Sequence, residues 1–140
     1  MRQRVLLDTG PLVALLDRSD RYHNWATREW ANIELPLLTC EAVVTEACFL
    51  LKRVYGGEAT VISFIDRGTI NISFSLNEEV VAVGELLNRY QSVPMSLADA
   101  CLVRMAELFD ESELLTLDSD FLIYRKNRNQ NIAAIAPKDI

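Results

Sequence analysis

The sequence predicts an α/β fold of three layers, in which a parallel sheet of about five strands lies between helices. Short apolar runs alternate along the chain with longer segments whose apolar residues recur at helical spacing. No internal repeat and no linker rich in Gly, Ser or Pro interrupts this alternation. Because parallel strands need long crossover connections, strands that alternate with helices favour a parallel sheet. With 140 residues the chain has the usual size of one domain, so residues 1–140 are expected to share one core.

The first half of the chain begins with a strand, a turn and a helix. The apolar residues 5–7 are followed by Asp8, Thr9, Gly10 and Pro11. Proline favours the first position of a helix, so Gly10 is the expected N-cap of a helix that runs to residue 16. The next expected elements are a helix over 22–31, a strand over 35–39, a helix over 41–54 that Gly56 and Gly57 close, and a helix over 58–67.

The second half continues the same alternation. It predicts a strand over 70–74, helices over 78–90 and 97–109, a strand over 113–117, a helical turn over 119–124 and a strand over 132–135. The basic run 124–128 after the turn either binds phosphates or is a solvated turn of ordinary surface charge. In open parallel sheets, ligands bind outside the carboxyl ends of the strands. A functional site is therefore expected where strands end and helices begin.

Two acids follow predicted strands. Asp8 ends the first strand, and Asp is also a common turn residue beside Gly and Pro. With the helix expected to begin at Pro11, Asp8 is too early to be its cap. Asp118 ends the strand over 113–117, although either Asp118 or Asp120 could simply cap the turn that follows. Both strand ends are thus candidate positions for a carboxylate that points into the crevice.

Two further acids lie within predicted helices. Glu46 has Val43 three residues before it and Leu50 four residues after it, so it is expected on an apolar face. A carboxylate buried there needs a cation or an arginine partner. Asp99 follows Ser96 by three residues, which is the spacing of a capping box, so a role at the start of the helix competes with a role in a site.

Together the four acids indicate a metal site. Ligand sets made only of oxygen suit Mg²⁺ or Mn²⁺ and not zinc. The formal net charge of −6 counts against tight, non-specific binding of nucleic acid. Two bound divalent cations would offset much of this charge at the site itself, so the acidity is compatible with a metal-dependent nuclease. The single histidine, His23, is assigned no catalytic role.

The cysteines and the hydropathy indicate a cytoplasmic protein. Cys40, Cys48 and Cys101 are odd in number and form no C-x-x-C pair, so we expect small buried side chains in a reducing compartment. No stretch approaches the ~20 apolar residues of a membrane span, and the N-terminal run is interrupted at Asp8, Gly10 and Pro11. Neither a signal peptide nor an anchor is expected.

Four segments occur in the order LLDTGPLVALLD, VVTEACFLL, SLADACLVRMAE and LLTLDSDF. In these segments and their spacing, the chain resembles the PIN-domain family and, within it, the VapC-like toxins of toxin-antitoxin systems. The resemblance implies Mg²⁺- or Mn²⁺-dependent cleavage of RNA, a small antitoxin as partner, and a homodimer. It implies that the acids of the site are Asp8, Glu46, Asp99 and Asp118, that Asp120 shares or replaces the fourth ligand, and that the Thr9 and Thr116 hydroxyls support the metal or its waters.

Two alternatives remain open. A non-catalytic PIN-like domain that only binds a protein partner would keep the fold without the chemistry. Another α/β metal-dependent phosphohydrolase is a weaker alternative, because an aspartyl-phosphate enzyme of the haloacid-dehalogenase kind needs a second Asp two residues after the first, where this chain has Gly10.

Overall fold

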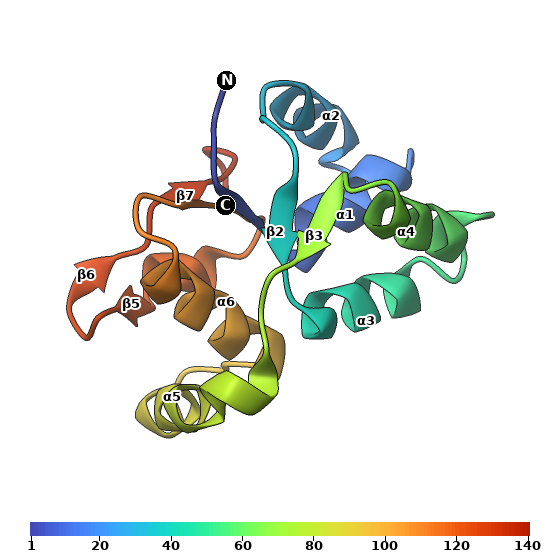
Figure 1. The fold of residues 1–140 in the computed structure, drawn as a ribbon. Helices are drawn as coiled ribbons and strands as arrows, with labels where there is room; N and C mark the ends of the chain where they lie inside the picture. The colour runs from blue at the N-terminus through green and yellow to red at the C-terminus, as the bar shows by residue number, and fades with distance from the viewer.

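The sheet has five parallel strands, as the sequence predicted. The computed structural model describes all residues, 1–140, and orders the strands β3-β2-β1-β4-β7 (Figure 1). In the middle of the sheet, Leu6 pairs with Leu38 on one side and with Leu114 on the other. The strands are β1 (Val5–Leu7), β2 (Leu37–Thr39), β3 (Ile70–Ile72), β4 (Glu113–Leu115) and β7 (Ala134–Ile135).

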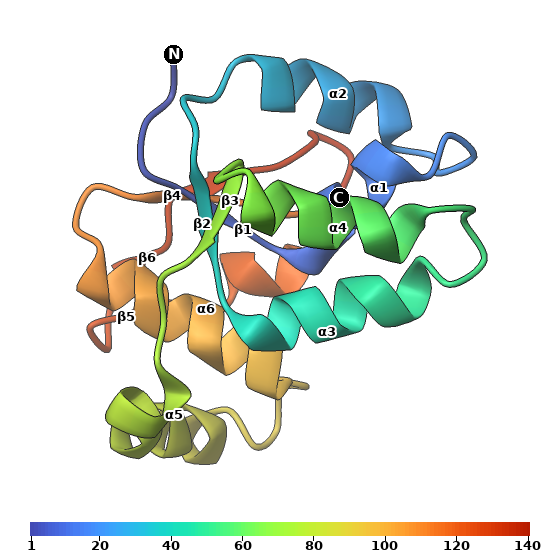
Figure 2. The same cartoon turned by 45° about the vertical axis from the view of Figure 1, so that its right-hand side comes forward.

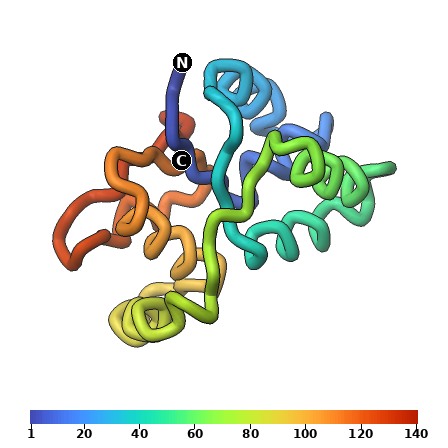
Figure 3. Tube along the Cα trace, viewed as in Figure 1, coloured from blue at the N-terminus to red at the C-terminus, as the bar shows by residue number.

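Six helices cover the two faces of this sheet. In Figures 2 and 3 the first four helices gather on one side, and the later part of the chain, with α5 and α6, occupies the other. The helices are α1 (Thr9–Leu16), α2 (His23–Ala31), α3 (Glu41–Leu50), α4 (Gly57–Asp66), α5 (Leu76–Arg89) and α6 (Leu97–Leu108), with a short 3-10 helix η1 (Ser119–Leu122). None of these helices is long and apolar enough to cross a membrane.

Alternation along the strands divides the core in two. Leu6 and Leu114 pack with Val83 and Leu102 of α5 and α6 on one face. Neighbouring strand residues point to the opposite face, where they pack with α1, α3 and α4. The residues of that second core include Val5, Leu7, Leu115, Leu12, Ala47, Leu51 and Val61. The central strand β1 is buried on both faces, so residues 5–7 appear in the sequence as an unbroken apolar run.

Several predicted boundaries were wrong. Strands β2, β3, β4 and β7 are each two residues shorter than expected, and two helix boundaries were misplaced. Helix α1 begins at Thr9, and its N-cap is Asp8, not Gly10. Pro11 is tolerated at the third helical position because the first N–H groups of a helix have no acceptor within it. Helix α3 ends at Leu50, and Gly56, with φ of 73°, directly precedes α4 instead of closing α3.

The basic run at 124–128 is neither a simple turn nor wholly exposed. It contributes strand β5 (Arg125–Lys126), which packs beside α6 and pairs antiparallel with β6 (Gln130–Asn131). The Arg125 guanidinium donates to the carbonyl oxygens of Leu122, Ile123 and Tyr124. These three hydrogen bonds fix the Arg125 guanidinium against the end of η1.

All three cysteines are free thiols. Cys40 and Cys101 are buried, and Cys48 is half-buried. Their placement agrees with the expectation of small side chains packed among apolar neighbours.

Candidate active site

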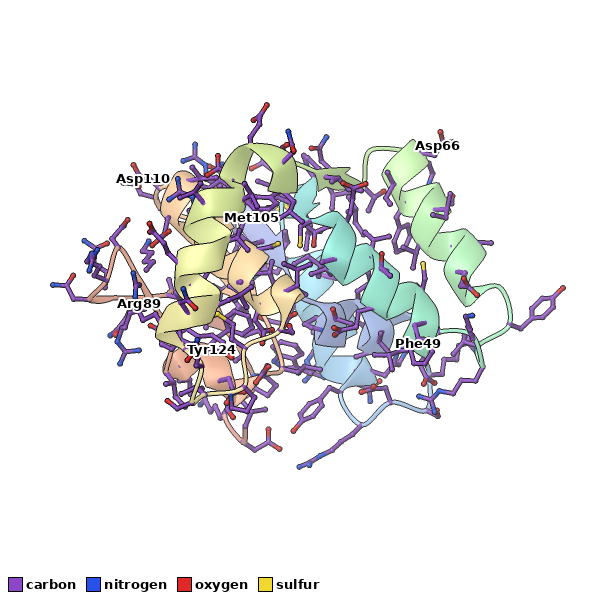
Figure 4. The ribbon with its side chains drawn as sticks, turned by 90° about the horizontal axis from the view of Figure 1, so that it is seen from below. Phe49, Asp66, Arg89, Met105, Asp110 and Tyr124 are labelled. Atoms are coloured by element: carbon purple, nitrogen blue, oxygen red, sulfur yellow. The ribbon has the colours of Figure 1, made fainter.

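The four predicted acids line one pocket at the carboxyl end of the sheet. The pocket has a volume of about 370 Å³ and lies where β1 and β4 end and where α3 and α6 contribute their acids (Figure 4 views the molecule from this lower side). Its lining contains no lysine, arginine or histidine. The lining residues are Asp8, Thr9, Gly10, Glu46, Leu50, Asp99, Leu117, Asp118 and Ser119.

Asp8 is the most buried of these acids, at 7% exposure. As N-cap of α1, its Oδ1 accepts a hydrogen bond of 2.7 Å from the Thr9 backbone N–H, and its Oδ2 accepts one of 2.7 Å from Thr116 Oγ1. Burial raises the pKa of Asp8 to about 6, and the nearby Asp99 and Asp118 carboxylates add to this rise, while the two hydrogen bonds oppose it. The ionised form of Asp8 is therefore held in an unfavourable environment that a cation would relieve.

Asp99 takes part in the capping box of helix α6 and also lines the pocket. The Ser96 side chain accepts from the Asp99 N–H at 3.0 Å, and Asp99 Oδ2 accepts from the Ser96 N–H at 3.1 Å, so the predicted capping box is present. Burial raises the pKa of Asp99, and the charge of Asp118 adds to this effect. The Oδ1 atom has no hydrogen-bond partner within the chain, so capping leaves one oxygen free.

Asp118, not Asp120, lines the pocket. Asp118 Oδ1 accepts from the Asp120 N–H at 2.9 Å and thereby caps η1, while the Asp118 N–H donates to Thr116 Oγ1 at 2.9 Å. The Asp118 Oδ2 atom has no hydrogen-bond partner. As with Asp99, the predicted capping role is real and still leaves one oxygen for a ligand.

Glu46 does not lie on the buried face that was predicted for it. The core residues of α3 are Val43 and Ala47, followed by Leu51, while Glu46 is exposed at the rim of the pocket. The prediction failed because Leu50, taken as a core neighbour, is itself 44% exposed and lines the pocket. Glu46 forms no ion pair, so the alternative of an arginine partner is also not observed.

Sequence reasoning did not assign Tyr124 to the site. This fully buried tyrosine places its hydroxyl 3.3 Å from Asp99 Oδ2. The sequence marked residue 124 only as the end of a turn, and no motif there pointed to a contact with a residue 25 positions earlier. Leu50, Leu117 and Ser119 also line the pocket without having been predicted.

The donor set fits a hard divalent cation. Carboxylate oxygens are the ligands that Mg²⁺ and Mn²⁺ prefer. Thr9 Oγ1 is buried in the pocket wall without a hydrogen-bond partner, which is the state expected of a hydroxyl that serves a bound ion or water. The carboxylates do not yet lie close enough together to coordinate an ion, because no group of three His, Cys, Asp or Glu residues meets the geometry of an ion site.

The parallel sheet between helices, with a pocket of acids at its carboxyl edge, gives the fold class. The family is identified by a match of the sequence to a family model. The family model described as PIN domain matches residues 5–127, and the chain belongs to this family. A search of proteins with curated annotation found no significant match.

Two solved structures share the fold. VapC20 of Mycobacterium tuberculosis, described as a sarcin-ricin loop cleaving toxin, aligns with a TM-score of 0.71 and 23% identity, over 83% of this chain and 91% of that one. VapBC2 of Rickettsia felis, in a complex with a DNA fragment from its promoter, aligns with a TM-score of 0.61 and 18% identity, over 96% of this chain and 98% of that one. At these identities the likeness is one of fold.

Proposed function

We propose that this chain is a metal-dependent endoribonuclease that hydrolyses phosphodiester bonds of RNA, and that it is the toxin of a toxin-antitoxin pair. The observation that carries the proposal is a pocket lined by four carboxylates and by no basic side chain. Such a concentration of negative charge is unfavourable unless cations bind there. Membership of the PIN-domain family and the likeness to a toxin that cleaves the sarcin-ricin loop support the same activity.

In this proposal Asp8, Glu46, Asp99 and Asp118 hold Mg²⁺ or Mn²⁺, with Asp120 outside the pocket. When bound, the cation supplies an acidified water and neutralises charge on the attacked phosphate. The expected products carry 5′-phosphate and 3′-hydroxyl ends.

The chain's own residues fix where these carboxylates stand. The Thr116 hydroxyl and the Thr9 N–H orient the two oxygens of Asp8. The capping hydrogen bonds at Ser96 and Asp120 fix one oxygen each of Asp99 and Asp118. In this proposal Glu46, exposed on α3 at the rim of the pocket, completes the ligand set.

The partners in this proposal are RNA, a small antitoxin and a second copy of the chain, in the cytoplasm. The likeness to VapBC2 of Rickettsia felis supports a regulated pair. Membership of a fold family does not by itself fix a partner, so binding is a separate question from cleavage.

The test is cleavage of a labelled single-stranded RNA by the purified protein in Mn²⁺ or Mg²⁺. EDTA and the variant Asp99→Asn are run beside the wild type, with circular dichroism to show that the variant is folded. Cleavage that needs metal and is lost in the folded variant supports the nuclease. An inert wild type on several RNAs, or a variant that cleaves equally well, favours the alternative of a protein-binding domain.

A further inference from the structure

One buried tyrosine connects the pocket to the core that packs with α5 and α6. Tyr124 follows η1 and is fully buried, near the end of α5 and the loop that leads to α6 (Figure 4). Its hydroxyl donates toward two acceptors: the Pro94 carbonyl oxygen at 2.5 Å and Asp99 Oδ2 at 3.3 Å. Pro94 stands two residues before the helix cap Ser96, so both acceptors belong to the start of α6.

Packing holds the ring of Tyr124 in place. Tyr90 and Phe121 contact it edge-on, with ring centroids at 5.1 Å and 5.3 Å. Tyr90 in turn accepts a hydrogen bond from the Arg125 N–H at 2.9 Å. The phenol of Tyr124 therefore stands on a rigid support, and its oxygen has little freedom to leave Asp99.

The Tyr124 hydroxyl acts as a hydrogen-bond donor to both acceptors. Burial raises the pKa of Tyr124, and the charges of Asp99 and Asp120 raise it further. A neutral phenol has one hydrogen to donate. Without it, Asp99 Oδ2 would keep only the Ser96 N–H, and the Pro94 carbonyl would lose its side-chain partner.

We propose that Tyr124 is a positioning residue for Asp99. Its hydroxyl ties the Asp99 carboxylate and the loop before α6 to the fixed aromatic cluster of Tyr90, Phe121 and Tyr124, and so turns the unpaired Oδ1 toward the pocket. The inference rests on the proposed function, because only in that function does Asp99 bind a metal. It differs from a purely structural role in that, of the two tyrosines in this cluster, only Tyr124 contacts an acid.

The two tyrosines provide a matched pair of variants. Tyr124→Phe and Tyr90→Phe each remove one hydroxyl from the same cluster. The first removes the donor to Pro94 and Asp99, and the second removes the acceptor of the Arg125 N–H, so only the first affects Asp99. Partners that orient a metal ligand typically change affinity or activity by about 10–100-fold. We expect Tyr124→Phe to weaken Mn²⁺ binding, measured by calorimetry, and to lower kcat within that range while KM for RNA stays unchanged. Tyr90→Phe should leave both close to wild type.

The result that overturns the inference is a Tyr124→Phe variant that matches Tyr90→Phe in Mn²⁺ affinity and kcat. Asp99→Asn separates this failure from a failure of the proposed function. If Asp99→Asn loses Mn²⁺ binding and cleavage while Tyr124→Phe keeps them, the function stands and the positioning role is wrong. If Asp99→Asn itself behaves as wild type, the metal site is wrong.

A measurement on the wild type covers the case in which Tyr124→Phe does not fold. The ¹³C signal of a tyrosine Cζ atom responds to the hydrogen bonding of its hydroxyl. Titration with Mg²⁺ should shift the Tyr124 signal and leave the Tyr90 signal in place. A Tyr124 signal that is unmoved at saturating Mg²⁺ would also overturn the inference.

Discussion

Thr116 Oγ1 donates a 2.7 Å hydrogen bond to Asp8 Oδ2 and accepts a 2.9 Å hydrogen bond from the Asp118 N–H. One buried hydroxyl thus joins the end of β4 to the end of β1 and orients two of the four acids of the pocket. The acids that it connects are far apart in the chain, so their mutual placement depends on the pairing of β1 with β4.

Replacing this hydroxyl should harm both the fold and the site. Thr116→Val leaves the Asp118 N–H without its acceptor and the buried Asp8 with one donor fewer, and each such loss costs about 1–3 kcal/mol. We expect a lower free energy of unfolding in urea and weaker Mn²⁺ binding. Thr39→Val is the control, because Thr39 Oγ1 donates to the Leu7 carbonyl at 2.7 Å and touches no acid. Equal Mn²⁺ affinities in the two variants would contradict this role of Thr116.

The raised pKa of Asp8 predicts a stability gain when its charge is removed. The folded state holds the Asp8 proton up to a pKa of about 6, against 3.8 ordinarily. Between these values the folded state binds more protons than the unfolded state, so stability falls as the pH rises through this window. In EDTA at pH 7, Asp8→Asn should therefore be the more stable protein, by on the order of 2 kcal/mol.

Two controls belong to this experiment. At pH 4 and below, wild-type Asp8 is protonated in the folded state, so the gain of Asp8→Asn should vanish. Saturating Mn²⁺ at pH 7 should stabilise the wild type and leave the variant unchanged, because a ligand stabilises only the state that binds it. A variant that is less stable than wild type at pH 7 in EDTA would show that the hydrogen bonds to Asp8 outweigh its burial.

A side chain at Gly10 should be destabilising because it would clash with Leu117, and not because of the backbone conformation of Gly10. A Cβ at this position would lie 3.0 Å from Leu117 Cβ and 3.2 Å from Leu117 Cδ1. Leu117 directly precedes Asp118, so Gly10→Ala should displace a wall of the pocket and cost about 1–3 kcal/mol through overpacking. Gly84→Ala on α5 is the control. A Cβ there meets nothing within 4 Å, and helix propensity predicts a gain of about 0.5–1 kcal/mol in urea unfolding.

The sequence was sufficient for the fold because the strands are short and mostly buried, and the central strand β1 is buried throughout. Apolar runs such as residues 5–7 have no alternation that would place them at a solvated sheet surface, and the helices between them require parallel crossovers. Helix starts were harder. A Gly-Pro pair suggested that α1 begins after Gly10, whereas the side chain of Asp8 caps the helix two residues earlier.

The sequence selected the four acids that line one pocket, but it did not predict the geometry of that pocket. Spacing within one helix placed Glu46 beside Leu50 correctly, yet it could not reveal that Leu50 faces a pocket instead of the core. The contact between Tyr124 and Asp99 depends on how η1 packs against α6, and this tertiary packing leaves no periodic signal in the sequence. Capping patterns were informative, since Ser96 and Asp99 form the predicted box.

Asp118 and Asp120 should differ sharply in function. Only Asp118 lines the pocket, and its Oδ2 is unpaired, whereas Asp120 offers its backbone N–H to Asp118 Oδ1. In Asp118→Asn the amide oxygen can still accept that hydrogen bond, and Asp120→Asn keeps its N–H, so both variants should fold. Loss of a metal ligand should lower Mn²⁺ affinity and cleavage by at least about 100-fold. This is the upper end of the loss caused by removing a residue that only orients a ligand. We expect this loss in Asp118→Asn, while Asp120→Asn stays close to wild type in calorimetry and in RNA cleavage. Equal losses would mean that the two carboxylates share the fourth position, with η1 turning to bring Asp120 into the pocket.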